Sequence, residues 1–218
     1  MLLIFDWDGT LIDSKQKITT AMQLAAEDLG WPVHEDVKIH NIIGLGLPEA
    51  IRSLYPAFSV GDLQRMREAY AARFLTLEAE GHSNLFPGVI ETLDWLRGRG
   101  HSLAIATGKS RKGLNRVFNN LGFADYFHST RCADETASKP NPMMLNELLA
   151  EFDVDPMDAV MVGDTEYDLA MARSINMPRI AVSYGAHHIS RLHAYEPALC
   201  LDQFDELLAW DRLAGADQ

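Results

Sequence analysis

The chain has 218 residues, of which 47% are hydrophobic and 23% are charged, so its composition is that of a folded globular protein and not of a disordered one. Its 31 acidic residues outnumber its 19 basic ones, and the formal net charge of -12 argues against a nucleic-acid or anionic-membrane partner. No apolar run approaches the ~20 residues of a membrane span, and the apolar start is too short for a signal peptide, so we expect a soluble, cytoplasmic protein.

The first predicted element is a strand, because the apolar run Leu2 to Phe5 is short and ends at an aspartate. The stretch that follows, residues 14–83, shows helical periodicity throughout and no convincing strand. Polar pairs at Asp13-Ser14 and Ser83-Asn84 are suited to hinges. We therefore expect an all-helical cap over residues 14–83. Its predicted helices run from Ile18 to Leu29, Val37 to Ile43, Leu47 to Leu54 and Leu63 to Leu77.

After the predicted cap, short apolar runs alternate with amphipathic segments. Because this alternation is typical of βα units, we expect an α/β fold in which residues 1–13 and 84–218 form a Rossmann-like parallel sheet core with helices on both faces. The further strands are predicted at Leu103 to Ala106, Ala159 to Val162 and Ile180 to Val182. The helices between and after them are predicted at Val89 to Arg97, Leu114 to Leu121, Met143 to Phe152 and Leu169 to Ile175.

Two carboxylates, Asp6 and Asp8, follow the first predicted strand directly. The carboxyl end of a strand is where open α/β sheets bind ligands. Carboxylates two residues apart can share a divalent cation and can divide nucleophilic and proton-transfer tasks. Gly9 allows the tight turn that this needs. A simple Asp-Gly turn is the alternative interpretation, but it explains neither Asp6 nor the strand before it.

A second carboxylate pair, Asp164 and Asp168, follows the predicted strand at Ala159 to Val162. Asp164 would stand at the strand end, and Asp168 one helical turn further on the same face. Acidic residues also cap helix N-termini well, which is the alternative interpretation. We expect Asp164 to do more than cap the helix.

Residues suited to phosphate occur at two further places. Thr107 and Gly108 follow the strand at Leu103 to Ala106 and offer a hydroxyl and a backbone N–H to phosphate oxygens. Lys139 lies in a loop stiffened by two prolines, just ahead of a predicted helix. A lone lysine is usually solvated, but one held rigidly at this position is a candidate partner for a phosphate or a carboxylate.

These four segments, in this order and after strands, resemble the four motifs of the haloacid dehalogenase superfamily. The helical insert resembles the family's C1 cap, which is found in phosphoglycolate phosphatases and β-phosphoglucomutases. The resemblance covers essentially the whole chain, and four motifs in order are far more specific than any one of them. It implies a hydrolase: a Mg²⁺-dependent phosphatase that cleaves small phosphate monoesters, phosphoglycolate or sugar phosphates, through an aspartyl-phosphate intermediate.

Carried over to this sequence, the resemblance assigns a role to each candidate residue. It implies that Asp6 is the nucleophile and that Asp8 is the general acid for the leaving group and then the base for water. The metal ligands it implies are Asp6, the backbone carbonyl of Asp8, and Asp164. Lys139 would neutralise Asp6 and the phosphate, and Asp168 would orient Lys139 or a metal-bound water.

The resemblance also assigns phosphoryl oxygens to Thr107 and to the amide of Gly108. One departure concerns Gly108, because the family more often has Asn or Ser there, and a side-chain contact is therefore lost. Magnesium and Lys139 together would offset the overall negative charge where a phosphate binds.

Other functions stay open at this stage. A phosphomutase of the β-phosphoglucomutase type would use the same residues with a sugar as the attacking group, whereas the aspartate at position 8 disfavours dehalogenation. A non-catalytic phosphate-binding module, such as a receiver-like domain, is disfavoured by the order of the motifs. The cap segment Asn41 to Glu49 has the glycines and the position of the family's substrate-specificity loop, yet it is equally well interpreted as a turn between helices. The substrate, and whether the protein is a monomer or a homodimer, are not decided by the sequence.

Overall fold

A computed structural model describes residues 1–81 and 84–216 of the protein. Within these residues the centre is a parallel sheet of six strands in the order β3-β2-β1-β4-β5-β6. Its central strand, β1, pairs with both β2 and β4, so the carboxyl ends of these three strands meet at one edge of the sheet. The strands are β1 (Leu2–Phe5), β2 (Ser102–Thr107), β3 (Ser129–Cys132), β4 (Ala159–Gly163), β5 (Arg179–Val182) and β6 (Leu199–Leu201).

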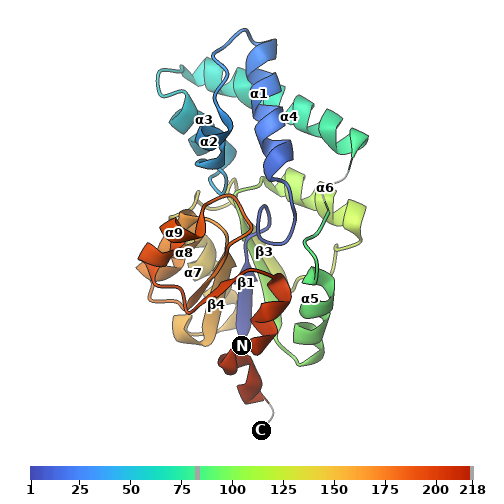
Figure 1. Cartoon of the computed structure of the whole chain (residues 1–218), viewed down its shortest axis with the longest axis vertical. Helices are drawn as coiled ribbons and strands as arrows, with labels where there is room; N and C mark the ends of the chain where they lie inside the picture. The colour runs from blue at the N-terminus through green and yellow to red at the C-terminus, as the bar shows by residue number, and fades with distance from the viewer. Residues whose placement is uncertain (82–83, 217–218) are drawn as a thin grey trace.

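Helices cover both faces of this sheet (Figure 1). Side chains alternate along β1, so that Leu3 and Phe5 pack with α5 and α6, whereas Leu2 and Ile4 pack with α7 and α8 on the other face. The predicted α/β class with helices on both faces is therefore confirmed. The core helices are α5 (Val89–Gly98), α6 (Arg111–Leu121), α7 (Met143–Phe152), α8 (Glu166–Ser174) and α9 (Ile189–Leu192). Short 3-10 helices lie at Pro156–Asp158, His193–Tyr195, Phe204–Ala209 and Asp211–Ala216.

In the described part of the chain, four further helices lie beyond the carboxyl ends of the strands (Figure 1). They are α1 (Lys15–Asp28), α2 (Asp36–His40), α3 (Leu47–Leu54) and α4 (Val60–Glu80). Buried side chains from all four form an apolar cluster of their own that includes Met22, Ile39, Ile51 and Met66. These helices thus bury their apolar faces mainly against one another.

The division into a core and a cap stays a prediction. At the predicted hinge the two chain segments lie together, because the amide of Asp13 donates to the carbonyl oxygen of Asn84 at 2.9 Å. Ser83, the other residue of the second predicted hinge, lies outside the described residues. The Ser59 hydroxyl and the Asp62 carboxylate form a capping box that starts α4, the longest of the four helices.

The structure differs from the sequence-based elements mainly in two strands and four helix starts, since α1, α4, α6 and α8 each begin three residues before the predicted start. The strands β3 and β6 were not predicted, because β3 carries polar residues and β6 has only three residues. Helix α6 begins at Arg111, since the Ser110 hydroxyl accepts a hydrogen bond from the amide of Gly113. Likewise α8 begins at Glu166, directly after its cap Thr165.

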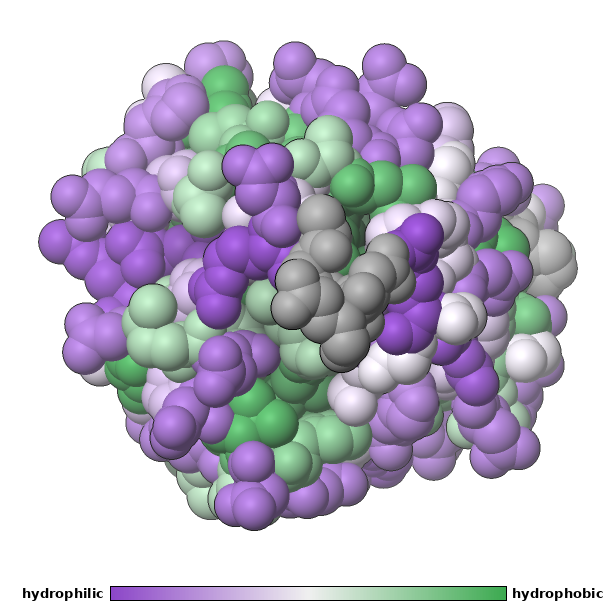
Figure 2. Space-filling view, turned by 90° about the horizontal axis from the view of Figure 1, so that it is seen from below, coloured by the Kyte–Doolittle hydropathy of each residue, from purple (hydrophilic) through white to green (hydrophobic). Residues whose placement is uncertain are grey.

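The surface at the end of the core opposite the cap helices is largely polar (Figure 2). Figure 2 views the end of the core opposite the cap helices and shows mostly hydrophilic side chains with smaller hydrophobic areas between them. Among the helices that the structure describes, none has both the length and the apolar character needed to cross a membrane.

Candidate active site

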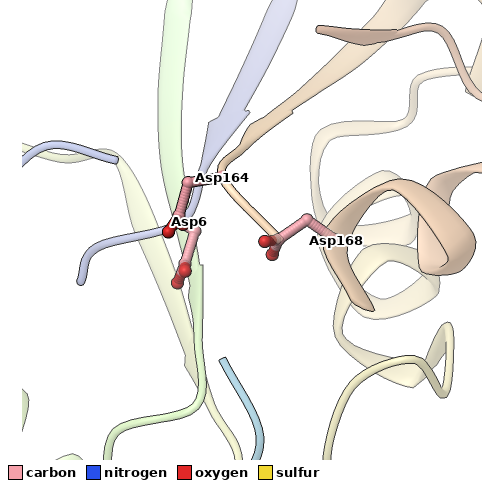
Figure 3. A group of neighbouring side chains, drawn as sticks. All are labelled: Asp6, Asp164 and Asp168. Atoms are coloured by element: carbon pink, nitrogen blue, oxygen red, sulfur yellow. The ribbon is translucent and has the colours of Figure 1, made fainter. Parts of the chain in front are cut away.

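The first and fourth strands place two aspartates side by side. β1 and β4 pair in parallel, with Phe5 opposite Val162, and the amide of Asp6 continues the ladder by donating to the carbonyl oxygen of Val162 at 2.9 Å. Asp164 follows the end of β4 at the same edge, so the two carboxylates are neighbours (Figure 3). The sequence-based expectation that both stand at a strand end holds.

Lys139 joins this pair to a third carboxylate. Its Nζ atom lies 2.7 Å from Oδ1 of Asp6 and 2.7 Å from Oδ1 of Asp168, and its side chain is fully buried. A buried ammonium between two carboxylates is held in position by charge and geometry together. The interpretation of Lys139 as a solvated surface lysine is thereby excluded.

Asp168 combines structural and electrostatic contacts. One of its oxygens accepts from the amide and the hydroxyl of Thr165, at 3.1 and 2.6 Å, and completes the capping box of α8. The other oxygen faces Lys139, and Figure 3 shows the carboxylate directed from the start of α8 toward Asp6 and Asp164. The capping interpretation and the lysine-orienting interpretation thus both describe contacts that Asp168 makes.

The Asp164 carboxylate is packed closely against small and polar groups. It accepts a hydrogen bond from the Thr10 hydroxyl at 3.0 Å and another from the amide of Ala186 at 2.7 Å. Gly9 has a φ of 84°, and a Cβ atom on it would lie 2.2 Å from Oδ2 of Asp164. A side chain at position 9 would therefore collide with this carboxylate, which explains why the Asp-Gly pair ends in glycine.

The cluster carries more negative than positive charge. The carboxylates of Asp6, Asp164 and Asp168 each bring one oxygen within 4.8 Å of the others, and Lys139 is the one cation that contacts this cluster among the described residues. With all three carboxylates ionised, two negative charges would be left without a counter-charge. Burial raises the pKa of Asp6 well above its usual value, although Lys139 opposes this shift. Burial and the charge of Asp168 raise the pKa of Asp164 to about 7.

Lys139 itself stays charged. Burial alone would lower its pKa, but the Asp168 and Asp6 carboxylates outweigh burial and raise the pKa above the usual value. The surplus of two negative charges therefore belongs to the carboxylates, and a divalent cation would balance it. Asp6 Oδ2 is buried and, within the described part of the chain, has no hydrogen-bond partner. Oxygen ligands, a charge surplus of two and an unpartnered oxygen fit Mg²⁺.

The carboxylate of Asp8 lies apart from this cluster. Both of its oxygens face Lys109, whose Nζ atom is 2.9 Å from Oδ1 and 2.8 Å from Oδ2, and the Ser14 hydroxyl donates to Oδ1 at 2.7 Å. The metal role that the resemblance implies for Asp8 concerns its backbone carbonyl, and this role stays a prediction. Sequence reasoning missed Lys109 and Ser14, although Lys109 directly follows the predicted phosphate-binding pair.

Thr107 and Gly108 lie at the same edge of the sheet, at the end of β2. Thr107 is buried, and its hydroxyl accepts a hydrogen bond from the amide of Lys109 at 3.2 Å. A Cβ atom on Gly108 would lie 2.5 Å from the carbonyl oxygen of Leu45 and 2.7 Å from that of Gly44. The missing side chain at position 108 thus leaves room for the backbone of the cap loop.

The cap segment from Asn41 to Glu49 docks on the core at several points. The Tyr167 hydroxyl donates to the carbonyl oxygen of Asn41 at 2.6 Å, and the Arg191 guanidinium donates to the Asn41 side chain. The amide of Gly46 donates to the Ser138 hydroxyl, one residue before Lys139, at 2.8 Å. Residues 41–46 of the segment form a turn between α2 and α3, and Leu47 to Glu49 begin α3.

Comparison with known proteins finds relatives over nearly the whole chain. The family model described as haloacid dehalogenase-like hydrolase matches residues 3–182. A protein of Dickeya dadantii, named a probable phosphatase, IndB, is 35% identical over 213 residues, which are 95% of this chain and 91% of that protein. A phosphoglycolate phosphatase of Vibrio vulnificus is 31% identical over 214 residues, 95% of this chain and 94% of that enzyme.

Solved structures show the same fold. A hydrolase from Pseudomonas syringae superposes with a TM-score of 0.88 at 21% identity, over 97% of this chain and 98% of that one. CbbY from Rhodobacter sphaeroides, solved in complex with phosphate, has a TM-score of 0.80 at 25% identity, over 94% of this chain and 95% of that one. By its family match, and in agreement with the site described above, the chain belongs to the haloacid dehalogenase-like hydrolases.

Proposed function

We propose that the protein is a magnesium-dependent phosphatase that hydrolyses small phosphate monoesters through an aspartyl-phosphate on Asp6. The observation that supports this most directly is the fully buried Lys139, 2.7 Å from both Asp6 and Asp168 at the carboxyl edge of the sheet. Its close relatives are named phosphatases, which agrees with this chemistry.

In the first step Asp6 attacks phosphorus. Its Oδ2 atom is free of hydrogen bonds from the described residues, so a lone pair is available to form the new bond to phosphorus. The ester P–O bond breaks at the same time, and Asp8 gives a proton to the leaving alcohol oxygen. Lys139, together with the hydroxyl of Thr107 and the amide of Gly108, stabilises charge on the phosphoryl oxygens.

In the second step water attacks the phosphorus of the aspartyl-phosphate. Asp8, now a carboxylate, takes a proton from the water, and the bond between phosphorus and the Asp6 oxygen breaks. Inorganic phosphate leaves and the Asp6 carboxylate is restored. The same side chain thus acts as an acid and then as a base.

Magnesium would be held by Asp6, the backbone carbonyl of Asp8 and Asp164, and when bound it supplies positive charge next to the transferred phosphoryl group. The charge surplus of the carboxylate cluster supports a divalent ion there. The chain's own contribution is to fix the ligands, and Thr10 and Ala186 do this for Asp164.

For the substrate we propose phosphoglycolate or a small sugar phosphate. Several relatives are named phosphoglycolate phosphatases, and CbbY was solved with xylulose-1,5-bisphosphate. The cavity beside Asp8 is small and is lined by both core and cap residues, among them Ser14, Phe74, Glu78 and Lys109. The cytoplasmic location and the choice between monomer and homodimer stay predictions.

A panel of phosphate monoesters tests the proposal. The purified protein with Mg²⁺ is expected to release inorganic phosphate from at least one of phosphoglycolate, small sugar phosphates and nitrophenyl phosphate, and Asp6→Asn is expected to release none. Absence of Mg²⁺-dependent release across the panel would contradict a phosphatase. Isomerisation of a monophosphorylated sugar in the presence of its bisphosphate, without release of phosphate, would identify a mutase instead.

A further inference from the structure

Lys109 makes a contact that none of the motif assignments includes. Its Nζ atom lies 2.9 Å from Oδ1 and 2.8 Å from Oδ2 of Asp8, and the Lys109 side chain is only 13% exposed. Ser14 donates its hydroxyl to the same Oδ1 at 2.7 Å. Both oxygens of the proposed acid and base are therefore fixed by two donors, an ammonium and a hydroxyl.

Both the backbone and the side chain of Lys109 make contacts that hold the residue in place. Its amide donates to the Thr107 hydroxyl at 3.2 Å, and its carbonyl oxygen accepts from the amide of Ala133, also at 3.2 Å. The Nζ atom lies 5.0 Å from the centroid of the Phe74 ring, which belongs to α4 among the cap helices. The lysine thus spans from the phosphate-binding loop to the cap, with Asp8 between them.

A proton-transfer group works only when its reacting oxygen is directed at the proton it moves. An aspartate on a turn can rotate about its side-chain bonds, and a contact to both oxygens removes that freedom. We infer that Lys109 is a positioning residue, which together with Ser14 holds the Asp8 carboxylate in one orientation for proton transfer. The inference rests on the acid–base role proposed above for Asp8.

A different role for Lys109 would be direct contact with the substrate, since it lines the same small cavity as Asp8. The two roles predict different kinetics. Loss of a substrate contact raises KM with little change in kcat, whereas loss of positioning lowers kcat at nearly constant KM. Positioning also predicts a dependence on the leaving group, because a sugar alkoxide needs a proton from Asp8 and nitrophenolate does not.

The first experiment compares Lys109→Met with wild type. We expect kcat for a sugar phosphate to fall by about tenfold to a hundredfold, part of the roughly 10²–10⁴ that a general acid–base group contributes. The first step with nitrophenyl phosphate should be far less affected. Lys109→Arg keeps the charge and donors and should recover part of the rate, and Lys109→Gln replaces the methionine variant if that one does not fold.

Lys17→Met is the matched control. Lys17 carries the same charge close to the same cavity, but its Nζ atom donates to the carbonyl oxygen of Gly81 and not to Asp8. It should leave the kcat ratio between the two substrates unchanged. An equal change of that ratio in both variants would show that charge near the site, and not the contact of Lys109 with Asp8, is responsible, and would overturn the inference.

A double-mutant cycle decides whether Lys109 acts through Asp8. In an Asp8→Asn background, Lys109→Met should slow hydrolysis of the phosphoenzyme by less than about twofold, since its target is already lost. A further large loss, or a rise in KM at unchanged kcat in the wild-type background, would overturn the inference. Failure of the proposed function would give a different result, because the wild-type protein would then form no acyl phosphate on Asp6.

Discussion

Asp6 has two carboxylate oxygens with different surroundings. Oδ1 lies against Lys139, and Oδ2 is buried and receives no hydrogen bond from the described residues. A nucleophile needs one oxygen for phosphorus, so the chemistry depends on how many oxygens a bound cation occupies. The choice of cation therefore bears directly on this residue.

We expect Mg²⁺ to support turnover and Ca²⁺ to inhibit it. Calcium takes more ligands, in less regular geometry, and binds carboxylates through both oxygens, which would leave Asp6 none for the attack. Initial rates with each cation alone, followed by titration of Ca²⁺ into the Mg²⁺-loaded enzyme, check this. Equal turnover with the two cations would contradict the metal role given to Asp6.

At this scale the sequence predicts some residues and misses others. Asp6, Asp164 and Lys139 could be found because strand ends converge on one edge and because the prolines around Lys139 mark a rigid loop. Lys109 could not be assigned, since its partner Asp8 is 101 residues away and only the pairing of β1 with β2 brings them together. Thr10 was missed for a related reason, because its partner Asp164 is 154 residues away.

At the scale of elements, the cap loop lies close against the end of β2. The carbonyl oxygens of Gly44 and Leu45 occupy the space that a side chain on Gly108 would need. Position 108 is glycine where the family more often has Asn or Ser. The backbone of the cap loop occupies the space that the missing side chain would need.

Gly108→Ala should separate cap closure from stability. A Cβ atom there would lie 2.5 Å from backbone, so the cap loop must move outward and the site stays partly open to water. We expect kcat/KM to fall by about tenfold to a hundredfold, the scale of a small misplacement at an active site. Amide exchange across residues 41–49 should become faster while the melting temperature changes little.

Gly98→Ala is the control for the same chemical change. A Cβ atom on Gly98, at the end of α5, meets no atom within 4 Å, so neither activity nor exchange in the cap loop should change. Normal activity of Gly108→Ala would show that activity does not depend on close packing of the cap loop against residue 108. The cap loop would then be interpreted as a simple turn between helices.

The elements that the sequence predicted best are those with strong periodicity. β1, α3 and α7 have the predicted bounds, because β1 is an apolar run that ends at Asp6, α3 lies between Gly46 and Pro56, and α7 starts directly after Pro142. The edge strand β6 was missed because it is short and partly exposed. Packing with its neighbour β5, which sequence periodicity does not record, is what orders it.

At the scale of the whole molecule, the acidic cluster makes the folding stability of the protein depend on the bound divalent cation. The carboxylates of Asp6, Asp164 and Asp168 share one buried lysine, so the metal-free fold carries the cost of repulsion between them. The pKa of Asp164 is raised to about 7, above that of an unfolded aspartate, so its ionisation lowers the stability of the metal-free protein as pH rises from about 4 to about 7. At pH 8 the loss of stability that comes from ionisation of Asp164 is complete.

Magnesium should therefore stabilise the protein at pH 8. With the cation at a hundred times its Kd, the free energy of unfolding rises by about 2.7 kcal/mol. For a chain of this size that corresponds to a rise in melting temperature of about 5–10 °C. Thermal melts in a chelator and in Mg²⁺ measure it without any assay of activity.

Asp164→Asn should remove both the destabilisation in the metal-free protein and most of the stabilisation by Mg²⁺. The variant removes one ionised carboxylate from the cluster, so its melting temperature in the chelator should exceed that of wild type, and Mg²⁺ should raise it far less. Asp125→Asn, at an exposed carboxylate, should behave as wild type in both conditions. A large Mg²⁺ shift in Asp164→Asn would contradict the ligand role of Asp164.

The central claim is that a phosphoryl group passes through Asp6, and Asp8→Asn tests it most directly. Nitrophenolate leaves without a proton, so the variant should still transfer phosphate to Asp6, but it lacks the base for the second step. Rapid mixing with nitrophenyl phosphate is expected to give a burst of nitrophenolate close to one equivalent per enzyme, followed by slow turnover, with phosphate trapped on Asp6. Asp6→Asn should give no burst. A uniform loss of rate for nitrophenyl and sugar phosphates, with no phosphate on the protein, would contradict the account.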